Sequence, residues 1–156
     1  YYSENDKWFR YLRDQHLGPA KYNSIMMGLL NERSFDIEKA KNLLWMTEDN
    51  IRTLNEEGHV IGLHSFSHPT QMSKLSASEQ LAEYKKNLAH LASITENRKI
   101  DTMSHPCGDY NTDTLKVLSD LGIQLGFRSN MAVEEIKSPL EIPRENHANI
   151  FKEMRR

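Results

Sequence analysis

Two histidines four residues apart, His64 and His68, stand where an apolar run of the sequence ends. In a continued strand four residues span about 13 Å, too far for two nitrogens that bind one zinc ion at about 2.0–2.1 Å. On a helical turn, positions i and i+4 lie on one face. A shared divalent metal ion, zinc above all, therefore requires a tight turn through Ser65 and Ser67, and Pro69 disfavours a helix through the residue before it. The alternative is a pair that faces solvent or forms ordinary hydrogen bonds, since a metal needs at least one further protein ligand.

A second segment with reactive side chains, MSHPCGDYN at residues 103–111, follows a strand-like run. Pro106 and Gly108 predict a tight turn whose exposed backbone N–H groups can stabilise an oxyanion. An ordinary turn, with His105 and Cys107 as local packing, is the alternative. The sequence shows no helix N-terminus or basic neighbour that would lower the pKa of the Cys107 thiol, so it favours a buried, inert thiol over a nucleophile.

The length and composition indicate one polar globular domain over residues 1–156. The formal charge of −2 gives no reason to expect nucleic acid or an anionic membrane as a partner. No apolar run approaches the roughly 18 residues of a membrane span, and no signal peptide is visible, so we expect a cytoplasmic protein. With Cys107 as its one cysteine, the chain forms no intrachain disulfide.

The order of local patterns predicts the elements that position these residues. Helices are expected in the first third, at 5–16, 21–32, 37–45 and 48–57, with Asp36 and Thr47 as N-caps. Beyond them, strands are expected at 59–65, 100–105, 123–129 and 140–145, and helices at 75–98 and 111–122. Ser76 and Glu79 have capping-box spacing at the start of the helix at 75–98.

This alternation predicts an α/β fold with parallel strands and crossover connections. In such sheets and barrels the reactive groups collect at the carboxyl ends of the strands. His64, His68 and the loop that begins at His105 follow such ends. We therefore expect these residues to face the same crevice.

Together these segments resemble the polysaccharide deacetylase family, the NodB-homology carbohydrate esterases, over roughly residues 50–150. The sequence HSFSH is similar to the family's His-Ser/Thr-x-x-His motif, which implies that His64 and His68 are the metal ligands. GFRSN and EIPRENHANI are similar to the tail of a subgroup found among surface-polysaccharide enzymes. In that tail His147 stands for the late histidine that acts as the general acid, and Arg144 can anchor a substrate oxygen or a carboxylate. The letters around His147 differ from the usual Leu-x-His, and a surface pair that starts the terminal helix is the alternative.

The sequence SHPCG is similar to the family's Arg-x-Pro-Tyr-Gly loop. The match implies a substrate-binding role for Pro106 and Gly108. Ser104 stands where the family usually has the arginine that orients a catalytic carboxylate, and Cys107 stands where it usually has tyrosine. The backbone N–H of Cys107 can still serve as an oxyanion donor, because that role needs no side chain.

The resemblance implies a metal-dependent hydrolase that removes N-acetyl groups from a sugar or surface polysaccharide, with zinc as its cofactor. The implied fold is an incomplete (β/α) barrel of the polysaccharide deacetylase type, with a helical N-terminal third. The family opens with a strand that carries an Asp-Asp pair, one residue the catalytic base and the other a metal ligand. This sequence contains no such pair and begins with tyrosine, so we expect that strand to lie upstream of Tyr1.

Two further expectations follow from the missing strand. A barrel without its first strand exposes sheet edges, which favours a homodimer or strand exchange. The absence of the Asp-Asp pair also leaves an alternative function open. That alternative is a catalytically inactive deacetylase-like fragment, or a domain that binds sugar or a protein partner without turnover.

Overall fold

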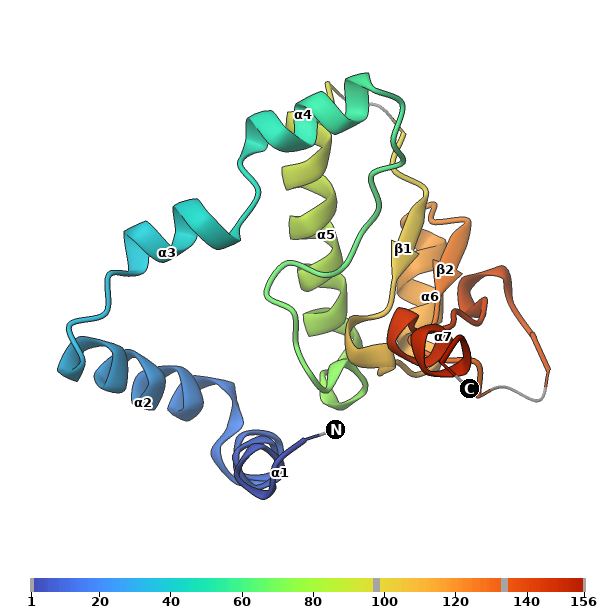
Figure 1. Ribbon diagram of the computed structural model, residues 1–156. Coiled ribbons are helices and arrows are strands. Elements are labelled where there is room, and N and C mark those ends of the chain that lie inside the picture. The colour runs from blue at the N-terminus through green and yellow to red at the C-terminus, as the bar shows by residue number, and fades with distance from the viewer. Residues whose placement is uncertain (1, 97–98, 133–134, 156) are drawn as a thin grey trace. The chain divides into compact units, whose positions relative to one another are not determined.

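The computed structural model describes residues 2–96, 99–132 and 135–155 of the chain (Figure 1). The contacts within the chain divide it into two compact units, Tyr1–Thr47 and Glu48–Arg156. The single domain expected over residues 1–156 stays a prediction. Among the described residues, no helix has both the length and the apolar character needed to cross a membrane.

The first unit is helical, as the sequence predicts. It contains α1 (Glu4–Tyr11), a π-helical segment (Leu12–Leu17), α2 (Gly18–Glu32) and α3 (Ile37–Leu44). The helix expected at 5–16 is therefore α-helical only as far as Tyr11. Asp36 caps α3 as predicted, since its carboxylate accepts a hydrogen bond from Lys39 N at 2.9 Å. None of the described residues of this unit is buried.

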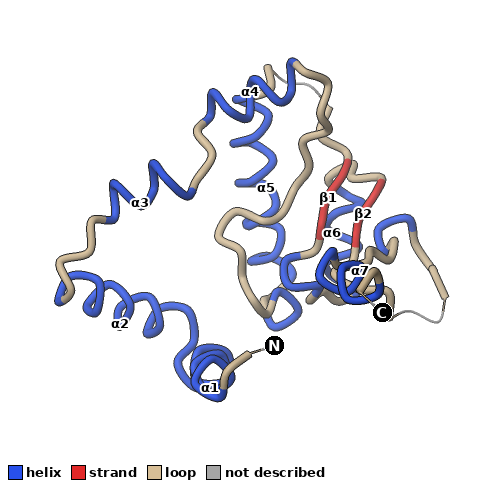
Figure 2. The backbone as a smooth tube through the Cα atoms, viewed as in Figure 1, coloured by secondary structure: helices blue, strands red, loops and turns tan. Residues whose placement is uncertain are grey.

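The second unit alternates helices with short strands (Figures 1 and 2). Its elements are α4 (Glu48–Glu56), α5 (Ala77–Ile94), β1 (Thr102–Ser104), α6 (Thr112–Asp120), β2 (Leu125–Phe127) and α7 (His147–Glu153), with 3-10 turns at Met72–Lys74, Pro106–Gly108 and Pro139–Glu141. The capping box of Ser76 and Glu79 begins α5, as predicted. The helix expected at 75–98 ends earlier, at Ile94, and residues 97–98 lie outside the described residues.

Parallel pairing arranges the chain around β1 and β2. The two strands pair in the register Thr102–Leu125, Met103–Gly126 and Ser104–Phe127. A parallel bridge joins Leu63 to Met103 on the other side of β1, and another joins Ile142 to Phe127 on the other side of β2. The order across the sheet is therefore Leu63, β1, β2 and Ile142, which confirms an α/β fold with parallel strands.

The strands expected at 59–65 and 140–145 are wrong in extent, because each is reduced to a single bridge. Leu63 N–H donates to Thr102 O, and Leu63 O accepts from Ser104 N–H, both at 2.9 Å. The chain then leaves the sheet, because Ser65 has a left-handed φ of 61°. At the other edge, residues Pro139–Glu141 form a 3-10 turn and Pro143 has no N–H to donate, so pairing is confined to Ile142.

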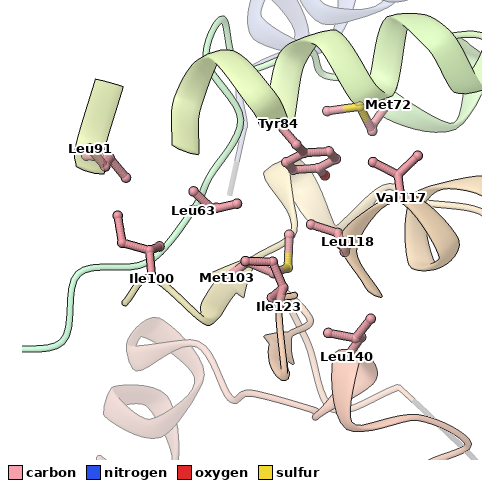
Figure 3. Packing of buried hydrophobic residues seen from close by; sticks show 10 residues of the cluster. All are labelled: Leu63, Met72, Tyr84, Leu91, Ile100, Met103, Val117, Leu118, Ile123 and Leu140. Carbon is pink, nitrogen blue, oxygen red and sulfur yellow. The ribbon is translucent and has the colours of Figure 1, made fainter. Parts of the chain in front are cut away.

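An apolar cluster packs α5 and α6 against the parallel segments (Figure 3). Its buried members are Leu63, Met72, Tyr84, Leu91, Ile100, Met103, Val117, Leu118, Ile123 and Leu140. The burial of Tyr84 raises the pKa of its hydroxyl, which therefore stays protonated at neutral pH. Tyr84 faces this core and holds the surrounding turn of α5 in place. Its neighbours Glu83 and Lys85 therefore lie outside the core.

We expect Leu63→Ala to lower the free energy of unfolding by about 2–5 kcal/mol, because a packed core loses a large apolar side chain. Leu63 is 1% exposed, whereas Val60 in the same segment is 76% exposed. Val60→Ala is thus the matched control and should change the free energy of unfolding by less than about 0.5 kcal/mol. Urea denaturation followed by circular dichroism measures both, and equal effects of the two substitutions would contradict the packing described.

Candidate active site

The carboxyl ends of the parallel segments meet at one edge of the sheet, where the sequence predicts a crevice. The residues that follow the paired positions are His64 after Leu63, His105 after β1, Arg128 after β2 and Pro143 after Ile142. His105 N–H also donates to Phe127 O at 3.0 Å, which ties the end of β1 to the end of β2. This edge brings together side chains that lie far apart in the sequence, and it defines the candidate site.

His64 and His68 lie on a tight turn, the conformation that a shared metal ion would require. Ser65 and His68 both have left-handed backbones, with φ values of 61° and 55°, and the Ser65 hydroxyl accepts a hydrogen bond from His68 N at 3.1 Å. The two imidazole rings come to 4.9 Å between centroids, with 66° between their planes. The turn therefore brings the two rings together on a conformation that non-glycine residues seldom adopt.

One hydrogen bond determines which nitrogen of His64 carries the proton. His64 Nδ1 donates to Ser104 O at 2.7 Å, and a carbonyl oxygen only accepts, so Nε2 keeps its lone pair. Burial lowers the pKa of His64 below 6.5, the charges of His68 and Arg144 lower it further, and the bond to Ser104 opposes them. His64 is thus neutral at pH 7, with its ring oriented in the way that metal-bound histidines are usually held.

The donor set fits part of a metal site. His64 and His68 offer imidazole nitrogens from one turn, which suits zinc and other divalent transition metals. In the part of the chain that the structure describes, no group of three or more His, Cys, Asp and Glu side chains gathers around one point. A catalytic zinc ion usually has three protein ligands. Among the described residues, His64 and His68 are therefore a candidate pair of ligands, one short of the usual three.

Two residues of α5 hold this turn, and the sequence predicts a role for neither. Glu83 accepts hydrogen bonds from Phe66 N, Ser67 N and Ser67 Oγ at 3.1, 2.8 and 2.9 Å. Asn87 Oδ1 accepts one from His64 N at 3.0 Å. Polar residues four apart on an amphipathic helix are usually a solvated face, so nothing in the local sequence distinguishes them. Only the packing of α5 against the turn does so.

The turn at Pro106–Gly108 forms as predicted, with Pro106 buried. Cys107 is exposed and has a left-handed φ of 53°, so the expectation of a buried thiol is wrong. The packing of the turn decides this, because Pro106 is its buried residue and the side chain of Cys107 stays outside the core. Gly108 follows with φ of 71° and donates its N–H to His105 O at 3.0 Å.

His105 is a packing residue, the alternative that the sequence allows. It is 1% exposed, and its ring stacks on Tyr110 at 4.1 Å between centroids. Its Nε2 donates to Leu140 O at 2.8 Å, and burial lowers its pKa, so the imidazole is neutral. Tyr110 in turn donates its hydroxyl to Glu141 Oε1 at 2.8 Å. These contacts fasten the end of β1 to the 3-10 turn before Ile142.

The structure places His147 and Arg144 at the start of the last helix. His147 is the first residue of α7, which Asn146 caps, and both His147 and Arg144 are exposed. The charge of Arg144 contributes to the lowered pKa of His64, so the guanidinium lies within electrostatic range of that imidazole. Arg144 is thus the residue of this segment with an observed influence on the site. The catalytic role of His147 stays a prediction.

A family comparison agrees with this arrangement. Residues 26–126 match the family model described as polysaccharide deacetylase. The chain belongs to the polysaccharide deacetylase family. The match begins within α2, earlier than the resemblance over 50–150 implies, and it ends within β2, before the tail at 141–150. No curated protein matches the sequence of this deacetylase family member.

Solved structures share the fold at low sequence identity. The Streptococcus pyogenes deacetylase PplD, in complex with acetate, is 19% identical with a TM-score of 0.57, over 97% of this chain and 78% of that chain. The deacetylase domain of BpsB from Bordetella bronchiseptica is 17% identical with a TM-score of 0.56, over 65% of this chain and 48% of that chain. These two likenesses confirm the α/β fold of the deacetylase type, of which the described parallel segments form an incomplete barrel.

A CE4 family pseudoenzyme from Bacillus anthracis is 21% identical with a TM-score of 0.46, over 49% of this chain and 26% of that chain. The deacetylase family member described here thus spans about a quarter of the Bacillus anthracis structure and about half of the Bordetella bronchiseptica one, 26% and 48% of their lengths.

We expect Gly108→Ala to destabilise the protein by more than Gly122→Ala. Both glycines have left-handed backbones, with φ of 71° and 81°, so both substitutions carry a strain of about 1–2 kcal/mol. A Cβ at Gly108 would also lie 2.0 Å from Ser129 Oγ, whereas none of the described atoms lies within 4 Å of one at Gly122. Denaturant unfolding measures the difference, and adding Ser129→Gly to Gly108→Ala should remove the excess. Equal effects at the two glycines would contradict the close approach of Ser129.

Proposed function

We propose that this chain forms the histidine side of the active site of a metal-dependent carbohydrate N-deacetylase. The proposed reaction is hydrolysis of an N-acetyl group on a sugar or surface polysaccharide. The observation that carries the proposal is the hydrogen bond of 2.7 Å from His64 Nδ1 to Ser104 O. It leaves Nε2 of a neutral imidazole available beside the ring of His68, at the edge of the sheet where active sites of such folds lie.

His64 and His68 would hold the metal ion, zinc above all. When bound, zinc supplies a Lewis acid and lowers the pKa of water from about 15.7 to about 7. The position of both rings depends on the turn through Ser65 and on the parallel bridge of Leu63 to β1. The role of this chain in metal binding is therefore to present two nitrogens from one rigid turn.

The turn at Pro106–Gly108 would bind the substrate and stabilise the oxyanion. Its proposed donor is the backbone N–H of Cys107, since the exposed position of this residue at the edge of the sheet suits contact with a substrate. Pro106 and Gly108 would shape the turn around the sugar. Gly108 itself donates to His105 O, which closes the turn instead of leaving this N–H for a ligand.

Arg144 and His147 would act on the other side of the bond that breaks. His147 is exposed, and an imidazole can pass a proton to a leaving amine. Arg144 would anchor a substrate oxygen or a carboxylate through its planar guanidinium. The products would be acetate and an amino sugar. No residue of this chain is assigned as the base, because the sequence has no Asp-Asp pair.

An alternative proposal is a deacetylase-like domain that binds a sugar or a partner without turnover. The observation that favours it is Ser104, which stands where the family usually has arginine. The Ser104 hydroxyl is buried and has no hydrogen-bond partner among the described residues. A serine in this setting cannot orient a catalytic carboxylate as an arginine would. Acetate release by a form of the protein that carries the family's Asp-Asp strand decides between the two proposals.

We expect the wild-type chain to bind a zinc ion, and His64→Ala and His68→Ala each to lose it. Equilibrium dialysis with elemental analysis measures the bound metal, and His59→Ala, at an exposed histidine that pairs with Glu57, is the control. Since metal binding needs neutral imidazole and the pKa of His64 lies below 6.5, binding should persist at pH 7. It should fall as the pH drops through that lowered value. Equal metal content in all four proteins would refute the site.

We expect the 156-residue chain to release little or no acetate from N-acetylated sugars, because its sequence contains no Asp-Asp pair. A form of the protein that carries the family's Asp-Asp strand should release acetate. In that form His147→Ala should lower kcat by about 10²–10⁴-fold with unchanged metal content, as expected for a general acid. Loss of metal in His147→Ala would show that His147 is a metal ligand. An unchanged kcat would show that it is a surface residue without a catalytic role. Ordinary turnover by the 156-residue chain would mean that one of its other carboxylates acts as the base.

A further inference from the structure

One face of α5 lies against the turn that carries the two histidines. Its contacts come from Glu83, Lys86, Asn87 and His90, which follow the spacing i, i+3, i+4 and i+7 of a single helical face. The apolar core holds α5 on the neighbouring side of the helix through Tyr84 and Leu91. The histidine turn therefore rests on a helix that is itself fixed in place.

Glu83 satisfies the backbone at the centre of the turn. Its carboxylate accepts two consecutive N–H groups, those of Phe66 and Ser67, and also the Ser67 hydroxyl. Hydrogen bonds to an ionised acceptor are stronger than those between neutral groups. Since the turn has left-handed residues at Ser65 and His68, its conformation needs such bonds to persist.

Asn87 fixes the first histidine by its backbone. Its Oδ1 accepts His64 N–H at 3.0 Å, while His64 Nδ1 donates to Ser104 O at 2.7 Å. The main chain of His64 is thus tied to α5 and its ring is tied to β1. These two bonds come from different elements, and together they determine the direction of the ring.

Phe66, between the histidines, is also held by α5. Lys86 Nζ lies 3.9 Å from the centroid of the Phe66 ring, and the His90 ring meets it edge-on at 6.3 Å. Phe66 is 43% exposed, so burial alone does not hold it. The contacts with α5 therefore extend over the whole turn from His64 to Ser67.

We infer that Glu83 and Asn87 are positioning residues, which hold the turn in the conformation that brings His64 and His68 onto one metal ion. The inference rests on the proposed function, because it assigns the turn to metal binding. Neither residue is proposed to touch the metal or the substrate. Glu83 acts through the backbone of residues 66 and 67, and Asn87 acts through the backbone of His64.

The test compares substitutions that separate the charge of a side chain from its length. Glu83→Gln keeps the length of the side chain and removes its charge, whereas Glu83→Asp keeps the charge and shortens the side chain. Asn87→Asp retains an oxygen that can accept His64 N–H, and Asn87→Leu does not. Glu56→Gln, at an exposed carboxylate near the end of α4, is the matched control. Zinc affinity is measured by competition with a chromophoric chelator, and the exchange of the Phe66 and Ser67 amides is measured by NMR without metal.

Glu83→Gln, Glu83→Asp and Asn87→Leu should each weaken zinc binding by about 10–100-fold, while Asn87→Asp stays close to wild type. The Phe66 and Ser67 amides should exchange about tenfold faster in both Glu83 variants, and Glu56→Gln should change neither quantity. Wild-type affinity in Glu83→Asp would mean that charge, and not position, is what Glu83 supplies, and it would overturn the inference. If the wild-type chain binds no zinc, the proposed function fails. The exchange measurement then decides the positioning role by itself, and unchanged exchange in the Glu83 variants would overturn it.

Discussion

The parallel pairing of Leu63 with β1 is the contact on which the rest of the site depends. Two backbone hydrogen bonds, from Leu63 N to Thr102 O and from Ser104 N to Leu63 O, place the residue before His64 against the end of β1. The side chain of Leu63 enters the apolar core, so the pairing cannot slip by one residue without exposing it. The chain leaves the sheet directly afterwards, and the histidine turn begins at the edge where β1 and β2 also end.

Around this contact, the turn is held from two directions. The ring of His64 forms a hydrogen bond with the last residue of β1, and the backbone of the turn forms hydrogen bonds with Glu83 and Asn87 of α5. A turn with two left-handed, non-glycine residues is unfavourable in isolation. Hydrogen bonds from a strand and a helix stabilise this turn, which holds the two imidazoles side by side. This arrangement suits metal binding, because ligands that already lie close together need little rearrangement when the ion binds.

At the same edge, the segment SHPCG resembles the family's Arg-x-Pro-Tyr-Gly loop with two of its side chains altered. In the segment SHPCG the buried proline and left-handed glycine keep the turn, although serine and cysteine replace the usual arginine and tyrosine. The turn can therefore offer backbone groups to a substrate without the usual side chains. Catalysis requires more, since the sequence has no Asp-Asp pair and Ser104 has no charge to orient a carboxylate. Turnover of the proposed substrate thus depends on groups other than these turns.

The sequence by itself determined the helices of the first third and the α/β class, because these follow from local spacing, caps and periodicity, and it permitted the tight turn between His64 and His68. Asp36 and Ser76 begin helices as their side chains predict, since an N-cap acts within a few residues of itself. The sequence could not determine that the strands expected at 59–65 and 140–145 are reduced to single bridges. Strand length depends on which distant backbone groups form hydrogen bonds with the segment. Nor could it predict that Cys107 is exposed or that Glu83 and Asn87 hold the histidine turn. Only the tertiary structure decided those points, since burial and side-chain hydrogen bonds between segments some 20 residues apart arise when α5 packs beside the turn.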